Sequence, residues 1–118
     1  MRDFQSLLAW QRAHALTLEI YEASAAFPQN ERYAFTQQVR RAASSIGANL
    51  AEGCGHDSPA EFARFVGISL GSASELENHL LLAGDLGYVP NEKRQILSKK
   101  TQEVKQMLTG LKRKLRPR

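Results

Sequence analysis

Apolar residues recur every three or four positions in four separate stretches of this chain, and this spacing constrains its fold more than any other feature. The apolar stripes occupy residues 9–27, 35–53, 62–83 and 97–115. Such spacing places side chains on one face of an α-helix, and no stretch sustains the alternation typical of a strand. We therefore expect an all-α fold with helices over about residues 5–26, 31–54, 58–87 and 91–116.

Local signals mark where the helices start. Pro28 should end the first helix, since proline disfavours helical geometry in the residue before it, and Asn30 is a candidate N-cap for the second. The third start is the clearest, because Ser58 can cap, Pro59 suits the first helical position and Glu61 occupies the third.

Glycines mark where the helices stop. Gly53 and Gly55 are predicted to end the second helix and Gly87 the third, since glycine readily takes the left-handed conformation that closes a helix. Gly47 lies inside the second helix, where glycine costs about 1 kcal/mol relative to alanine. We expect a packing reason for it, with close approach of a neighbouring helix as the simplest.

Short connections between helices of similar length favour antiparallel neighbours, hence an antiparallel up-down four-helix bundle in a single domain, residues 1–118. The third helix also carries apolar residues beyond its main stripe: Val66, Ile68, Leu70, Leu81 and Leu82. A helix that is apolar nearly all round should be buried nearly all round. We therefore expect self-association through this surface.

Several classes of protein are disfavoured. The single cysteine, Cys54, cannot form an internal disulfide, and no apolar run approaches the roughly 18 residues of a membrane helix. The N-terminal residues lack the apolar core of a signal peptide. We thus expect a cytosolic protein that does not associate with a membrane.

Positive charge gathers at the C-terminal end. Residues 92–118 hold ten Lys and Arg against two acids, a net +8, whereas residues 1–91 hold six Arg against ten acids, a net −4. Eight of these ten form the C-terminal basic set: Lys99, Lys100, Lys105, Lys112, Arg113, Lys114, Arg116 and Arg118. It offers the charge and multiplicity that phosphate contacts need, and no aromatic residues interleave it for base stacking. The alternative is a solvated helix face with a frayed tail.

Arg40 and Arg41 adjoin on the second helix and have two interpretations. Both arginines are candidate phosphate contacts. Alternatively, one pairs internally with Glu75 or Glu52, since a buried charge needs a partner. Apolar residues flank both arginines, which favours internal pairing for at least one of them.

Polar residues also stand where a bundle core would be apolar: Asn49, Glu52, Ser69, Ser72 and Glu75. They could form a small-molecule or metal site, or a hydrogen-bonded layer that fixes helix register. Di-metal bundles use Glu-x-x-His motifs, and the sequence contains none. We expect the layer, no cofactor and no catalytic residue.

The pattern resembles the four-helix-bundle proteins encoded by intervening sequences within bacterial 23S ribosomal RNA genes. The most specific matching pieces are Ala48-Asn49-Leu50-Ala51-Glu52-Gly53 and Gly71-Ser72-Ala73-Ser74-Glu75-Leu76. Further matches are Trp10-Gln11, Phe27-Pro28, Arg40-Arg41-Ala42-Ala43 and Leu86-Gly87-Tyr88. Gly47 departs from the pattern, since many members have a proline there, which would kink the helix. The accessory variability determinant proteins of diversity-generating retroelements are similar more weakly.

The resemblance implies a four-helix bundle that assembles into a five-fold ring, associates with nucleic acid and has no established enzymatic activity. The favoured hypothesis is a homo-oligomeric, pentameric accessory protein that binds nucleic acid, with RNA the favoured ligand, through phosphates. Its candidate contacts are Arg40, Arg41, Lys105, Lys112, Arg113, Lys114, Arg116 and Arg118. The alternative is a scaffold that docks a partner protein such as a polymerase or reverse transcriptase. A metal-binding or enzymatic bundle ranks last.

Overall fold

The computed structural model describes residues 2–115, and every regular element within that range is helical. The long helices are α1 (Leu8–Ser24), α2 (Phe35–Cys54), α3 (Pro59–Asp85) and α4 (Asn91–Lys114), and two short 3-10 helices are η1 (Phe4–Ser6) and η2 (Gln29–Glu31). The prediction of four helices and an all-α fold is confirmed.

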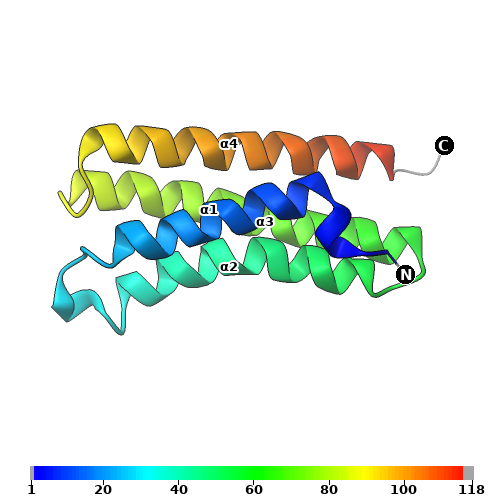
Figure 1. Ribbon diagram of the computed structural model, residues 1–118, viewed down its shortest axis with the longest axis horizontal. Coiled ribbons are helices and arrows are strands. Elements are labelled where there is room, and N and C mark those ends of the chain that lie inside the picture. The colour runs from blue at the N-terminus through cyan, green and yellow to red at the C-terminus, as the bar shows by residue number, and fades with distance from the viewer. Residues whose placement is uncertain (1, 116–118) are drawn as a thin grey trace.

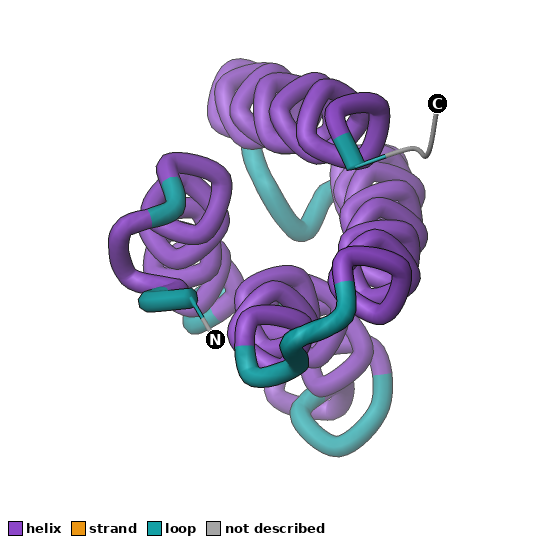
Figure 2. Tube along the Cα trace, turned by 90° about the vertical axis from the view of Figure 1, so that its right-hand side faces the viewer, coloured by secondary structure: helices purple, strands orange, loops and turns teal. Residues whose placement is uncertain are grey.

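The four long helices surround one shared interior. Helix α1 packs against α2 and α4, and α3 packs against the same two, while the diagonal pairs have no Cα atoms within 8 Å of each other. The connections lie at alternate ends of a rod with extents of 46 × 23 × 19 Å (Figure 1). Viewed along the rod, each helix has one side turned to the interior and one turned away (Figure 2). No helix in residues 2–115 is long and apolar enough to cross a membrane.

The apolar stripes form the core. Leu16, Ile46, Leu76 and Leu97, one from each helix, are at most 2% exposed. Burying a side chain of this size stabilises the fold by roughly 1.5–3 kcal/mol. Small residues lie between these large ones, with Ala13, Ala42, Ala43, Ala73 and Ala83 nearly or fully buried.

The first helix starts later than predicted. Asp3 accepts a hydrogen bond from the Gln5 N–H at 3.0 Å, which initiates η1 rather than α1. Leu7 then takes an extended conformation, with φ −76° and ψ 124°, so α1 begins only at Leu8. A local side-chain contact therefore divides the predicted helix into two pieces.

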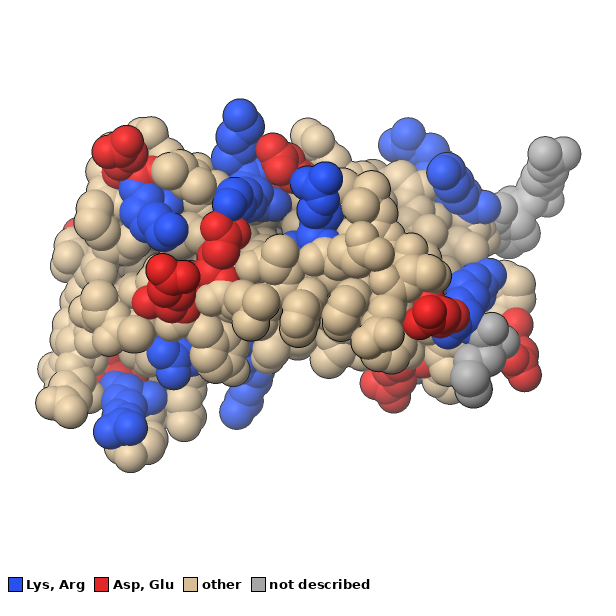
Figure 3. Space-filling model, in the orientation of Figure 1, with Lys and Arg blue, Asp and Glu red and all other residues tan. Residues whose placement is uncertain are grey.

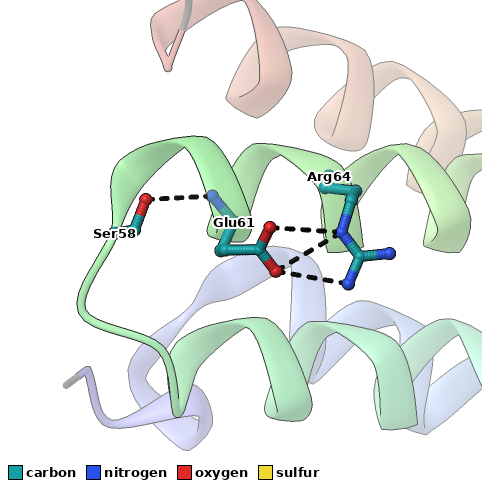
Figure 4. A network of polar contacts seen from close by, with 3 residues as sticks. All are labelled: Ser58, Glu61 and Arg64. Atoms are coloured by element: carbon teal, nitrogen blue, oxygen red, sulfur yellow. Dashed lines mark hydrogen bonds and ion pairs between the residues drawn. The ribbon is translucent and has the colours of Figure 1, made fainter.

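The predicted Asn30 cap is wrong. Asn30 lies inside η2, and α2 begins at Phe35 after Ala34, whose side chain cannot cap. By contrast, the Ser58 cap is confirmed, because its hydroxyl accepts a hydrogen bond from the Glu61 N–H at 3.3 Å (Figure 4). Glu61 also pairs with Arg64 one turn later, at 3.2 Å.

Two of the glycines act differently from prediction. Gly87 has φ +75° and is the only described residue with positive φ, as expected at the end of α3. Gly55 has φ −75°, so the predicted left-handed stop after α2 is wrong. Gly53 serves close packing instead, since a Cβ there would lie 2.8 Å from the Cβ of Phe65. At Gly47 the close neighbour is the indole of Trp10 on α1, 3.2 Å from a Cβ position.

The additional apolar residues of α3 divide into two groups. Val66 is fully buried and Leu70 is half-buried, so both contribute to the core. Ile68, Leu81 and Leu82 are 41%, 50% and 43% exposed. The interior of one chain thus accounts for only part of the apolar surface of α3.

Candidate nucleic-acid interface

Helix α4 has one buried face and one charged face. Leu97, Thr101, Val104 and Leu108 point into the core, because their spacing keeps them on one side of the helix. The remaining positions carry the cations. Figure 3 shows Lys and Arg side chains along the upper edge of the molecule, where α4 lies, with acidic side chains between some of them.

Two cations in the middle of α4 are paired with carboxylates. The Lys100 ammonium lies 2.6 Å from a carboxylate oxygen of Glu19 on α1, and the Lys105 ammonium lies 3.0 Å from one of Glu77 on α3. Hydrogen bonds from Lys105 and Gln102 lower the pKa of Glu77 below its ordinary value. These lysines join α4 to its neighbours, so they offer less free charge to a polyanion than the sequence implied.

The last turn of α4 differs. Lys112, Arg113 and Lys114 are consecutive, and within residues 2–115 none of them pairs with a carboxylate. Arg113 and Lys114 are exposed. Their charge also suits the helix C-terminus, where the backbone dipole is negative. Arg116 and Arg118, the remaining predicted contacts of the tail, lie outside the described residues.

Two glycines of α3 leave space that α4 cations occupy. The Lys112 ammonium is 3.2 Å from the place a Cβ on Gly67 would occupy. The Arg94 side chain is 2.7 Å from the corresponding place on Gly84. The long side chains therefore rest across bare backbone of the neighbouring helix.

Arg40 is held internally, but by neutral groups. Its Nε donates to the Ser24 hydroxyl at 2.8 Å and its Nη2 to the Tyr21 carbonyl at 3.2 Å. The guanidinium also lies 4.7 Å from the centroid of the Tyr21 ring. The predicted pairing with Glu75 or Glu52 is therefore wrong, since Arg40 is half-buried and bonds to α1 instead.

Arg41 is exposed, and its side chain makes no ion pair or hydrogen bond within the described part of the chain. Both arginines lie near the start of α2, at the end of the bundle opposite the last turn of α4 (Figure 1). The structure therefore does not bring the predicted cations together into one patch.

The predicted polar layer is smaller than expected. The Ser69 hydroxyl, fully buried, donates to the Ile46 carbonyl at 2.9 Å and so links α3 to α2. The Asn49 amide bonds within its own helix, to the Ser45 carbonyl at 2.8 Å. Glu52 and Glu75 are exposed rather than internal. No group of three or more His, Cys, Asp or Glu in residues 2–115 could hold a metal ion.

The helix arrangement and the sequence both match known proteins. A family model, that of the 23S rRNA-intervening sequence protein, matches residues 5–110. The chain belongs to this family. The resemblance inferred from the sequence is thus confirmed.

A solved structure is similar to this chain in fold. It is that of a protein of unknown function from the S23 ribosomal protein family of Bacteroides thetaiotaomicron. The two are 21% identical, the match covers 90% of this chain and 96% of the other, and the TM-score is 0.83. Among curated proteins, none matches the sequence.

Two further reactive side chains, Cys54 and His79, are shielded from solvent. Cys54 is buried, and burial raises the pKa of its thiol, which disfavours the nucleophilic thiolate. His79 lies edge-on to Phe35, with ring centroids 5.6 Å apart, and 3.9 Å from Glu75.

Three residues that sequence analysis did not single out lie beside Arg40. Arg32, Thr36 and Ser24 line the same hollow as Arg40, between the end of α1 and the start of α2. The available signal was the four-residue spacing of Arg32, Thr36 and Arg40, which places them along one side of a helical path.

Proposed function

We propose that this chain binds RNA through its phosphates, as a non-enzymatic, homo-oligomeric accessory protein. The observation that carries the proposal is the last turn of α4, where Lys112, Arg113 and Lys114 stand without carboxylate partners among the described residues. Arg41 supplies a further exposed cation. Membership of the 23S rRNA-intervening sequence protein family favours RNA as the polyanion.

Phosphate contacts fit these side chains better than base reading. Flexible cations neutralise phosphates regardless of sequence and release counterions, so binding should weaken steeply as salt rises. Bases would need aromatic platforms, and the residues of the last turn of α4 are basic and aliphatic. The expected ligand is therefore RNA without strong sequence preference.

Oligomer formation would multiply these contacts. We propose that antiparallel up-down bundles of this kind assemble into a ring, a pentamer by the resemblance noted above. The exposed Ile68, Leu81 and Leu82 of α3 supply apolar surface for the contact between copies. Several copies of a weak site in one particle raise the apparent affinity without a new contact.

A titration of labelled single-stranded RNA at several salt concentrations tests the proposal. The test variant replaces Lys112, Arg113 and Lys114 by Gln, and the matched control replaces Lys93, Arg94 and Lys99 on the same helix. Both variants lose the same charge, so a larger loss of affinity in the test variant supports the last turn as the site. Equal losses would reject that location, and absence of binding at low salt would reject the function.

The apolar residues of α3 also support a second candidate, a scaffold that docks another protein. Sedimentation at rising protein concentration separates the two ideas. A particle that stays monomeric would leave Leu81 and Leu82 free for a different partner and would overturn the ring. A multimer that dissociates when Leu81 and Leu82 become Gln would assign the surface to copies of this chain.

A further inference from the structure

A hollow of about 320 Å³ lies between the C-terminal end of α1 and the first turn of α2. We call it the α1–α2 hollow; it is lined by Ser24, Ala25, Phe27, Pro28, Gln29, Arg32, Thr36 and Arg40. Two arginines and no carboxylate line it, whereas the groove beside Lys105 includes Glu77 and the groove beside Lys100 includes Glu19 and Glu103. The α1–α2 hollow is therefore positively charged.

Arg40 is fixed in this position before any ligand arrives. The Ser24 hydroxyl and the Tyr21 carbonyl accept its hydrogen bonds, and the Tyr21 ring lies against its guanidinium. A guanidinium has more N–H donors than these two bonds use, and none of its charge is neutralised by them. An anion that binds here would meet a donor that has already lost its rotational freedom.

Thr36 supplies an uncommitted donor to the α1–α2 hollow. The residue is 6% exposed and lines the hollow, and its hydroxyl makes no hydrogen bond with any residue in the described range 2–115. The hydroxyl is not one of the enclosed unpaired side-chain atoms of this range, so it reaches the surface of the hollow. It is therefore free to donate to an acceptor that binds there.

The start of α2 adds to this character. Ala34 precedes the helix and provides no side-chain cap, so the first backbone N–H groups of α2 lack a side-chain acceptor. The helix dipole also places partial positive charge at this end. The carboxylate of nearby Glu31 accepts a hydrogen bond from the Tyr88 hydroxyl at 2.8 Å and does not line the hollow.

We propose that the α1–α2 hollow binds a phosphate group. Arg40 and Arg32 would donate to its oxygens from two sides, and the Thr36 hydroxyl would donate a further bond. The hollow is larger than a bare phosphate, so the group could be inorganic phosphate or the terminal phosphate of an oligonucleotide. The site lies at the opposite end of the bundle from Lys112, Arg113 and Lys114 (Figure 1), so it does not depend on the proposed RNA contacts of α4.

Amide chemical shifts of the full chain, followed by NMR during titration, test the site. The probes are inorganic phosphate, the dinucleotide UpU and the same dinucleotide carrying a 5′-phosphate. We expect saturable shifts of the Thr36 and Gln37 amides with inorganic phosphate, with a dissociation constant on the order of 1 mM. Tighter binding of the phosphorylated dinucleotide, with no shift from UpU, would identify an oligonucleotide end. If the phosphorylated dinucleotide binds no more tightly than inorganic phosphate, the ligand of the hollow is the free phosphate ion.

Variants connect the shifts to the residues. Thr36→Val keeps the shape and removes the hydroxyl, and Arg32→Gln changes an exposed side chain, so it leaves the core intact even if Thr36→Val does not fold. Each should weaken phosphate binding about tenfold, while Arg12→Gln, which changes an exposed arginine of α1 outside the hollow, should leave it unchanged. Shifts that never saturate, that centre on α4, or that persist unaltered in Arg32→Gln would overturn the proposal.

Discussion

Arg40 and the last turn of α4 carry the same kind of charge in opposite surroundings. Arg40 is bound by a hydroxyl, a carbonyl and an aromatic ring, so its position is determined by the fold. Arg113 and Lys114 extend from a helix end with no carboxylate partner in the described chain. A fixed cation suits a ligand of defined shape, whereas mobile cations suit a long polyanion of any sequence. The charge count alone does not distinguish these two uses.

The largest expected effect concerns the last turn of α4, whose cations have no carboxylate partner in the described chain. Replacing Lys112, Arg113 and Lys114 by Gln should lower the slope of log affinity for single-stranded RNA against log salt by about 2, since each lost phosphate contact removes roughly 0.7. Binding measured by fluorescence anisotropy at four or more salt concentrations gives the slope. An unchanged slope would mean that these cations do not contact phosphate. The free energy of unfolding should stay within about 0.5 kcal/mol of the parent.

Replacing Arg40 should instead lower the stability of the fold. Arg40→Ala removes two hydrogen bonds and the contact with the Tyr21 ring, so we expect a loss of about 2 kcal/mol in the free energy of unfolding. Urea denaturation followed by circular dichroism measures it. Arg41→Ala is the neighbouring control and should change stability by less than about 0.5 kcal/mol. Equal losses in the free energy of unfolding would show that the contacts of Arg40 do not stabilise the fold more than the exposed side chain of Arg41 does.

A smaller effect is expected at the acceptor. Ser24→Ala removes the hydroxyl that accepts from Arg40 Nε and donates to the Tyr21 carbonyl at 3.2 Å, so the loss should be about 1 kcal/mol. If the bond to Arg40 is stabilising, the double variant Ser24→Ala, Arg40→Ala should lose less stability than the two single losses added together. Strict additivity of the two losses in urea denaturation would show that the bond contributes nothing.

The smallest effect concerns a paired cation, Lys105. Its bond lowers the pKa of Glu77, so the stability from this pair is present at neutral pH and is lost as the pH falls through that lowered pKa. Lys105→Met should therefore reduce stability by less than about 1 kcal/mol at neutral pH and not at all in strong acid. Thermal unfolding at both pH values measures this. A penalty that persists in acid would trace to packing of the lysine stem instead.

Prediction from the sequence succeeded where the cause was local. Ser58 lies within three residues of the N–H group that it caps, so the spacing alone identified it. The cap predicted at Asn30 was wrong, because Asn30 lies in the 3-10 helix η2 and α2 begins only at Phe35. The apolar stripes were also sufficient to predict the four helices, since burial follows the 3.6-residue period directly.

The site was harder to predict because its contacts join distant parts of the chain. Arg40 reaches Ser24 and Tyr21, sixteen and nineteen residues away, and those partners depend on the register between α1 and α2. The pairing of Lys105 with Glu77 likewise depends on how α4 lies on α3. The net charge of each segment could be read from the sequence. Which cations would be paired with acidic or neutral partners could not.

Two glycines of α3, Gly67 and Gly84, lie beneath cations of α4, namely Lys112 and Arg94. A residue with no charge and no side chain thereby influences the electrostatic surface of the adjacent helix. In related sequences, these two pairs of positions should vary together, with a larger residue on α3 accompanied by a shorter or uncharged one on α4. Substitutions at these α3 positions, which carry no charge themselves, would thereby change the electrostatic potential at the surface of α4.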